Sequence, residues 1–404
     1  MFNTIDLFAG CGGLTDGFKK SRKFNMLAGV EWDKNAMLTL RKRLKNKWHY
    51  QDAEERIVHF DIQKIDELIN GFEHADGYKP SVGLKQLVGN TNVDVVIGGP
   101  PCQAYSIAGR IRDKNGMHDD YRNYLFESYI KVVKTFQPKV CIFENVQGML
   151  SASPGGVSIV HRITKAFDEA GYFISTNLKS DALFDTSDFG IPQKRLRLII
   201  IALKKADFPD CESKMKEFYN HLNSFKVIEK STVENALQGL PKIFPLRKPE
   251  KRRSHFVPKE ENIENLTSHE PRYHNLRDIE IFKLLAMDIK TKQNKYIHAD
   301  ALKALYTEKT GKVSAVHKYH VLRADLPSNT IPAHLYKDGL RHIHPDPEQA
   351  RSITVREAAR LQTFDDDFEF LGGSGAGYKM IGNAVPPLFA KYIALAVNKL
   401  LRTE

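Results

Sequence analysis

The chain of 404 residues is 42% hydrophobic and 27% charged, a composition typical of a soluble globular protein that is long enough to bury a large core. No run approaches the roughly 18 consecutive apolar residues of a membrane span. The N-terminus opens on a strand-like segment instead of a signal peptide, which predicts a cytoplasmic protein. Four widely spaced cysteines without Cys-x-x-Cys spacing argue against a disulfide framework or a zinc site. The formal net charge of +11 favours an anionic partner such as nucleic acid but does not identify one.

The chain begins with the pattern of a nucleotide-type site. Residues 3–8 predict a strand, residues 9–14 a glycine turn and the next residues a helix, so the backbone can approach a ligand closely beside free helix N–H groups. A second strand, residues 26–30, ends in Glu31, about twenty residues after the turn, where a ribose would be held. Glu31 could instead cap the helix that begins near Asp33.

Two further strands end in residues that could take part in binding or catalysis. Residues 59–62 form a strand end with a carboxylate, and residues 93–97 form a buried strand that Gly98-Gly99-Pro100-Pro101 must terminate. In a doubly wound sheet the carboxyl ends of strands share one crevice, which would gather Asp6, Glu31, Asp61 and Cys102.

Cys102 is a candidate nucleophile. A thiol reacts as the thiolate, which nearby positive charge favours, and Arg110 and Arg112 follow in a segment, residues 104–120, expected to be a mobile loop. The alternative is an inert cysteine in a structural Pro-Pro turn.

A carboxylate and two arginines follow on later strands. The strand of residues 139–143 ends in Glu144, whose pKa can be raised in a crevice, as a general acid requires; a helix cap or an ion pair is the alternative. Arg195 and Arg197, two residues apart before the strand of residues 198–202, are expected on one face, where they could meet phosphate or a base, or form a salt bridge within the protein.

The character of the chain changes between residues 204 and 350. Regular alternation of strands and helices is lost and aromatic residues lie among lysines, which predicts a second, smaller domain. Its histidines lack metal-site spacing and are expected to contact phosphate, base or solvent; they include His255, His269, His274, His317 and His320. Residues 247–259 form a basic stretch that either contacts nucleic acid or is a solvated loop.

The C-terminal part predicts a helix beginning near Thr354, a flexible glycine turn at residues 372–377 and an amphipathic helix over residues 387–401. We expect this last helix to return to the first domain and cover its edge.

The chain resembles the DNA (cytosine-5)-methyltransferases in six segments that occur in order. They are Asp6-Leu7-Phe8-Ala9-Gly10-Cys11-Gly12-Gly13, Gly99-Pro100-Pro101-Cys102-Gln103, Glu144-Asn145-Val146, Gln193-Lys194-Arg195-Leu196-Arg197, residues 351–362 and Gly382-Asn383-Ala384-Val385-Pro386-Pro387. Only about residues 204–345, the variable target-recognition segment of that family, lie outside the resemblance.

The resemblance implies S-adenosylmethionine as cofactor. Glu31 would hold its ribose and Asp61 would lie near its adenine, although Phe60 stands where the family usually has glycine before this aspartate. The other implied cofactor contacts are Phe8, Gly10, Cys11, Gly12, Trp32, Pro101, Leu125, Asn383 and Ala384.

The resemblance also implies a covalent mechanism. Cytosine C5 accepts a methyl group only after a thiolate, here that of Cys102, has added to C6. Glu144 would protonate N3, Arg195 would brace the base and Glu144, and Arg197 would contact the surroundings of Cys102 or phosphate. Because C6 is unreachable inside a duplex, the cytosine must be flipped out. DNA contacts are expected at Gln103, Ser106, Arg110, Arg112, Arg252 and Arg253.

These inferences predict an α/β fold: a doubly wound, Rossmann-like, S-adenosylmethionine-dependent methyltransferase domain plus a smaller, irregular target-recognition domain. The first would span residues 1–203, completed by 375–404, and the second residues 204–374, with the helix of residues 351–362 at the junction. The expected function is methylation of cytosine in a specific double-stranded DNA sequence. The enzyme would be a monomer in the bacterial cytosol, paired with a restriction endonuclease that acts on the same site without direct contact.

Three alternatives remain open at this point. A tRNA cytosine-5 methyltransferase shares the chemistry, but none of the four cysteines is followed by the Phe-Thr of that branch. A catalytically silent, methyltransferase-like DNA-binding protein would not need Cys102 and Glu144. A dinucleotide dehydrogenase accounts for the glycine turn alone.

Overall fold

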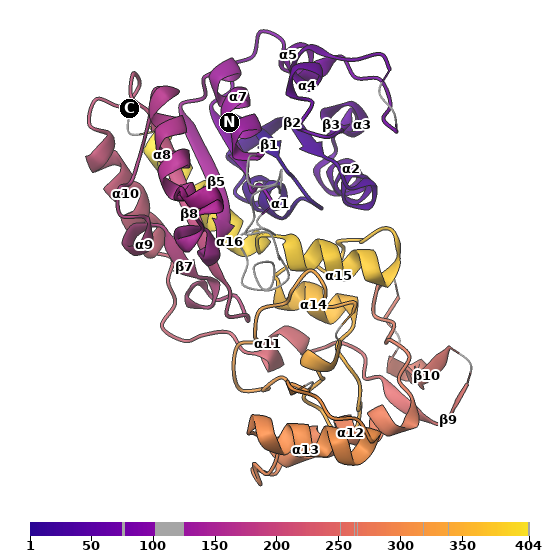
Figure 1. Cartoon of the computed structure of the whole chain (residues 1–404). Coiled ribbons are helices and arrows are strands. Elements are labelled where there is room, and N and C mark those ends of the chain that lie inside the picture. Colours follow the sequence, from indigo (N-terminus) through magenta and orange to yellow (C-terminus); the bar gives the residue numbers. More distant parts are fainter. Residues whose placement is uncertain are drawn as a thin grey trace. The chain divides into compact units, whose positions relative to one another are not determined.

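The computed structural model describes residues 1–74, 77–101, 125–250, 252–261, 263–264, 266–317, 319–337 and 339–402. The chain forms two compact units (Figure 1). Unit 1 contains residues 1–190, 195–228 and 384–404, and unit 2 contains residues 191–194 and 229–383.

Unit 1 is built on an eight-stranded sheet, counted over the described residues, with the order β3-β2-β1-β4-β5-β8-β6 and with β7 paired to β8. The strands β1 to β5 run parallel, and β8 is antiparallel to β5, β6 and β7. Their bounds are β1 (Phe2–Leu7), β2 (Phe24–Glu31), β3 (Ile57–His59), β4 (Val95–Gly98), β5 (Val140–Val146), β6 (Tyr172–Ile174), β7 (Leu183–Asp185) and β8 (Leu196–Lys204).

The strand order indicates where the crevice of the sheet lies. The chain leaves β1 for β2 on one side and later enters β4 on the other, so the carboxyl ends of β1 and β4 flank the point where the order reverses. The central strands are largely apolar, and Val95, Val96, Val140 and Leu198 are fully buried. Strands buried on both faces need helices on both sides, which confirms the predicted doubly wound α/β domain.

Helices of unit 1 flank the sheet, and α7 (Leu125–Phe136) is tied to it directly. The Tyr129 hydroxyl lies 3.0 Å from the carbonyl oxygen of Val96 and 3.1 Å from that of Ile142, so it bridges β4 and β5. The other helices are α1 (Gly13–Lys20), α2 (Lys34–Trp48), α3 (Ala53–Arg56), α4 (Ile65–Asn70), α5 (Gly83–Val88), α8 (Ile159–Glu169), α9 (Leu178–Asp181), α10 (Cys211–Asn223) and α16 (Pro387–Arg402).

The C-terminal helix α16 packs against α1 and α10, as Figure 1 shows by its yellow ribbon among the indigo and magenta elements of unit 1. Gly17 makes the close packing possible, because a Cβ there would collide with Ala390. The last helix therefore packs within unit 1, and that it covers the edge of this unit stays a prediction. Among the described residues one helical stretch, Gly373–Arg402, is long and apolar enough to cross a membrane, but 67% of its apolar window is buried in the protein, as in a core helix.

Unit 2 combines short helices with one two-stranded sheet among its described residues. Its core joins α12 and α13 to Tyr319, Val321 and Ile343. The elements are α11 (Val233–Leu237), β9 (Phe244–Glu250), β10 (Arg253–Phe256), α12 (Leu276–Lys290), α13 (Ala299–Thr310), α14 (Val355–Leu361) and α15 (Gly373–Asn383).

The units differ from the predicted domains at both boundaries. Helix α10, expected in the second domain, packs against β8 and α16 in unit 1, where the Tyr219 hydroxyl donates to the carbonyl of Ile199 at 3.0 Å.

The predicted flexible turn at residues 372–377 was wrong, because helix α15 begins at Gly373 and includes most of it. Small residues suit this helix since a Cβ on Gly377 would lie 2.7 Å from Val355 of α14.

The expectation that the unit 2 histidines contact ligand or solvent was wrong for three of the five. His255, His269 and His274 are buried and bonded to protein: His255 to the carbonyl of Gln349, His269 to the Thr354 hydroxyl, and His274 to the Ser352 hydroxyl. Burial lowers the pKa of His255 to about 4 and that of His274 to about 3. They are neutral core residues.

Candidate active site

The glycine turn after β1 has a backbone that few residues can adopt. Phe8 has φ 58, Gly10 φ 59 and Gly12 φ 96, all in the left-handed region. A Cβ on Gly12 would lie 2.5 Å from Leu40, whereas the space beside Gly10 is open for 4 Å. Residues held in sparsely populated backbone regions cluster at active sites and at sites that hold ligands.

Glu31 fixes the turn to the end of β2. Its Oε2 accepts the Gly10 N–H and its Oε1 accepts the Asp33 N–H, both at 2.7 Å. The helix that follows is capped by Asp33, which accepts from Asn35 and Ala36, so Glu31 is not its cap. Burial raises the pKa of Glu31 to about 7, against the effect of the two amide bonds.

A second buried carboxylate lies at the end of β5. Glu144 is 9% exposed, and its Oε1 is 2.7 Å from Nε of Arg197 on β8. In the antiparallel register Val146 is opposite Arg197 and Glu144 is opposite Ile199, so the two charged side chains are diagonal neighbours on one face. A Cβ on Gly99, just after β4, would lie 2.5 Å from Glu144 Oε2. Only glycine leaves room for the carboxylate in this place.

The surroundings of Glu144 favour a retained proton. Burial raises its pKa, while the charges of Arg197 and Arg195 oppose the rise. A carboxyl whose pKa is raised can act as a general acid, and the anion that remains is stabilised by the neighbouring guanidinium.

Comparison with known proteins shows which family this chain is similar to. The family model described as C-5 cytosine-specific DNA methylase matches residues 2–72 and 79–399. The chain belongs to this family. It is a DNA cytosine-5 methyltransferase with a Rossmann-like fold, which bears out the resemblance read from the six segments.

Relatives of this methyltransferase are of similar length. A type II methyltransferase of Bacillus paralicheniformis, M.Bpa9945I, is 33% identical, with 98% of each chain covered. M1.HphI of Haemophilus parahaemolyticus is 30% identical and covers 99% of this chain and 87% of its own. A DNA modification methyltransferase encoded within an Escherichia coli prophage superposes with a TM-score of 0.61 at 25% identity over all of both chains.

The remaining cofactor candidates of the methyltransferase lie at several strand and helix ends. Cys11 is 1% exposed and Leu125 begins α7, whereas Trp32 is 58% exposed. Asp61 follows β3 and accepts the Gln63 N–H at 3.0 Å. Pro101 is half-buried after β4. Asn383 ends α15 in unit 2 and Ala384 opens the last segment of unit 1.

The geometry of the turn fits S-adenosylmethionine. Half-buried Phe8 offers an aromatic ring, Gly10 offers open space, and Glu31 offers carboxylate oxygens already oriented by two amides. A ribose hydroxyl pair would find acceptors there. Within the described ranges, no three His, Cys, Asp or Glu side chains are grouped so that they could hold a metal ion.

The two arginines of the methyltransferase have different partners. Arg197 forms the ion pair with Glu144, and the charge of Arg195, which was expected to brace Glu144, also lowers the pKa of that carboxyl. Arg195 precedes β8 and donates from Nη2 to the carbonyl of Ala384 at 3.0 Å, and its backbone N–H donates to Asp185.

Two contributors to the site were not singled out from sequence. Gly99 makes room for Glu144, and the buried Asn145 donates to the carbonyl of Pro100 at 3.4 Å, so it connects β5 to the Pro-Pro turn. Both stand in the quoted segments, but no local pattern indicates contacts that arise between neighbouring strands.

Several predicted residues lie outside the described part of the chain: Cys102, Gln103, Ser106, Arg110 and Arg112. Of the predicted DNA contacts, Arg252 and Arg253 are described. Both are exposed, Arg252 between β9 and β10 with φ 73 and Arg253 at the start of β10.

Proposed function

We propose that this enzyme transfers a methyl group from S-adenosylmethionine to C5 of a cytosine flipped out of a specific duplex DNA sequence. Cys102 is the nucleophile: its thiolate bonds to C6 while N3 takes a proton from Glu144. The cofactor supplies an electrophilic methyl group. The resulting enamine would take up this methyl group through C5 as the S–CH3 bond breaks, which leaves S-adenosylhomocysteine. A base then removes the C5 proton, the C6–S bond breaks to release the thiolate, and the N3 proton returns to Glu144.

The main support for the proposal is the position of the Glu144 carboxyl, which is paired with Arg197 and occupies the space that Gly99 leaves open. Its pKa is raised by burial, so it can be protonated before the thiolate adds, and the anion left afterwards lies 2.7 Å from a guanidinium. Arg195 and Asn145 act as positioning residues. Arg195, just before β8, binds the carbonyl of Ala384, and Asn145, on β5, binds the carbonyl of Pro100.

The covalent step can be trapped. Fluorine at C5 cannot leave as a proton does, so a duplex with 5-fluorocytosine should form an adduct with the enzyme that survives denaturation when cofactor is present. We expect no adduct with Cys102→Ala and a normal adduct with Cys211→Ala, a half-buried cysteine on α10. An adduct that persists in Cys102→Ala would show that the nucleophile is misassigned.

We further propose a role in a type II restriction-modification system, as the names of the relatives indicate for them. The enzyme would act as a monomer in the cytosol, with unit 1 binding the cofactor and unit 2 reading the DNA. Bisulfite sequencing of DNA from cells that express the protein should reveal 5-methylcytosine within one short sequence. Methylation scattered without a common sequence, or found on tRNA and absent from DNA, would contradict this role.

A further inference from the structure

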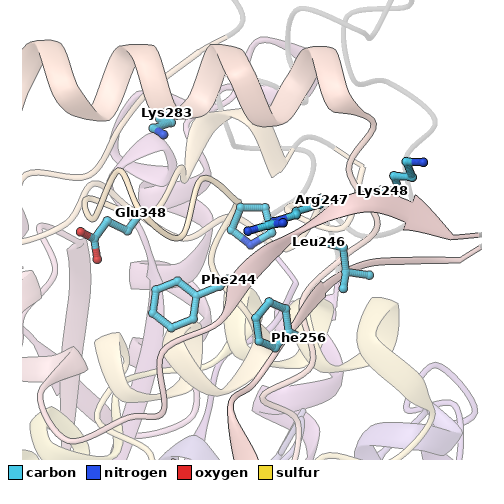
Figure 2. Close-up of a pocket in the computed structure, with 8 residues that line it drawn as sticks. Phe244, Leu246, Arg247, Lys248, Phe256, Lys283 and Glu348 are labelled. Carbon is cyan, nitrogen blue, oxygen red and sulfur yellow. The ribbon is translucent and has the colours of Figure 1, made fainter.

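Unit 2 contains a hollow of about 670 Å³ beside the β9–β10 hairpin (Figure 2). Phe244 and Arg247 come from β9, Phe256 from β10 and Lys283 from α12. The volume is within the range of about 300–1,000 Å³ that is typical of small-molecule sites.

One side of the hollow is aromatic. Phe244 and Phe256 are paired in the antiparallel register of the hairpin, and their ring centroids are 6.2 Å apart with a 44° angle between the planes. Figure 2 shows the two rings next to each other. Phe256 is 37% exposed, so part of an aromatic face is left in solvent. Such a face suits a flat, apolar group that can stack on it.

The rim is cationic. Arg247, Lys248 and Lys283 line the hollow together with a single carboxylate, that of Glu348. None of the three cations forms an ion pair with another residue that the structure describes. Their charge is therefore free to attract an anion such as a phosphate group.

The ring faces of bases inside a duplex are covered by their neighbours, so an aromatic wall gains little from paired DNA. A base outside the stack exposes both faces, and its backbone carries the phosphate that the cations favour. We propose that the hollow binds an unpaired nucleotide of a DNA strand, with the base stacked on Phe256 and the phosphate beside Arg247 and Lys283. The assignment to DNA rests on the proposed function.

Fluorescence anisotropy of the full-length protein tests the site with three labelled duplexes of one sequence. One is fully paired, one has a single unpaired thymidine, and one has an abasic residue at that position. Stacking on an aromatic side chain is worth about 1–3 kcal/mol per base, so the unpaired thymidine should bind about 5- to 150-fold more tightly than the other two probes. Phe256→Ala should abolish the difference.

Two variants complete the test. Lys283→Ala should weaken binding of the thymidine probe and reduce the salt dependence by about one phosphate contact. Leu284→Ala is the control for Phe256→Ala. Leu284 is 38% exposed, nearly the same as Phe256, but does not line the hollow, so its replacement should leave the binding of all three probes unchanged. Melting curves check that each variant is folded.

Equal affinity of the wild type for the three probes, or a preference that survives Phe256→Ala, would overturn the proposal. Tighter binding of the same unpaired nucleotide in RNA would overturn the assignment to DNA. Methylation of the paired duplex, measured in parallel, tests the proposed function separately. If the duplex is methylated but the three probes bind equally, only the proposed nucleotide site in the hollow is rejected. If the probes differ in a Phe256-dependent way but the duplex is not methylated, only the proposed methylation reaction is rejected.

Discussion

At the scale of single residues, the most informative contact is the one between Gly99 and Glu144. Because a methyl group on Gly99 would lie 2.5 Å from Oε2, Gly99→Ala should push the carboxyl away from its position. A displacement of this kind costs on the order of 100-fold in rate. We expect kcat to fall by that order while S-adenosylmethionine affinity, measured by calorimetry, stays within about twofold. A parallel loss of cofactor affinity would indicate a general structural defect instead.

Arg197 should set the pH range in which Glu144 is protonated. Its charge opposes the rise in the pKa of Glu144 that burial causes, so Arg197→Gln should raise that pKa further. Activity that needs the protonated carboxyl is lost as the pH rises through its pKa. The alkaline limb of the kcat profile should therefore move to higher pH in the variant, although kcat itself falls. Arg195→Gln should move the limb in the same direction by less. A shift to lower pH in either variant would contradict the assignment.

The candidate site residues at strand ends could be picked out from sequence because each strand is an apolar run that a glycine, proline or acidic residue terminates. Glu31 and Glu144 were found in this way. The partner of Glu144 was not, since the sequence spacing of Arg195 and Arg197 leaves open which of them points at β5. That choice depends on the antiparallel register that sets Val146 opposite Arg197.

At the scale of elements, the contact between α1 and α16 depends on Gly17. A Cβ there would collide with Ala390 and lie 2.6 Å from the carbonyl oxygen of Pro387. Alanine favours a helix by up to about 1 kcal/mol over glycine, but overpacking a close interface costs about 1–3 kcal/mol. Gly17→Ala should thus destabilise the protein in urea melts. Gly375→Ala, on α15 with no neighbour nearer than 4.0 Å, is the control and should be neutral or stabilising. Equal effects of the two variants would exclude the packing explanation.

Helix α15 shows why the glycine-rich segment misled the sequence prediction. Four of its residues are Gly373, Gly375, Gly377 and Gly382, which by propensity favour a turn. In unit 2, Gly382 packs against the backbone of Pro332 and Ala333 and Gly377 against Val355, so small size outweighs propensity. Tertiary contacts of this kind leave no local signal, and the same holds for α10, whose assignment to unit 1 depends on its contacts with β8 and α16.

At the scale of the whole molecule, the two units should respond to pH in opposite directions. In unit 2, burial lowers the pKa of His255 and His344 to about 4 and that of His274 and His342 to about 3. The unfolded chain binds protons on these residues below about pH 6.5 that the folded unit does not. The stability of unit 2 is therefore complete above pH 6.5 and is lost as the pH falls toward 4, by on the order of 3 kcal/mol for each histidine.

The stability of unit 1 should depend on pH in the opposite way. Burial raises the pKa of Asp6 and of Glu31 to about 7, so the folded unit holds protons that the unfolded chain releases near pH 4. Unit 1 without cofactor should consequently lose stability as the pH rises from about 4 to 7. Both tryptophans, Trp32 and Trp48, belong to unit 1, so their fluorescence reports its unfolding alone while circular dichroism reports both units.

Urea melts between pH 7.5 and 5 distinguish the two linkages. The midpoint by tryptophan fluorescence should rise as the pH falls, and a second transition seen only by circular dichroism should move to lower urea. His274→Asn keeps a hydrogen-bonding group near Ser352 but cannot take up a proton, so it should flatten the pH dependence of the second transition and leave the fluorescence midpoint unchanged. If both probes move together at every pH, the units unfold as one and their buried groups do not act separately.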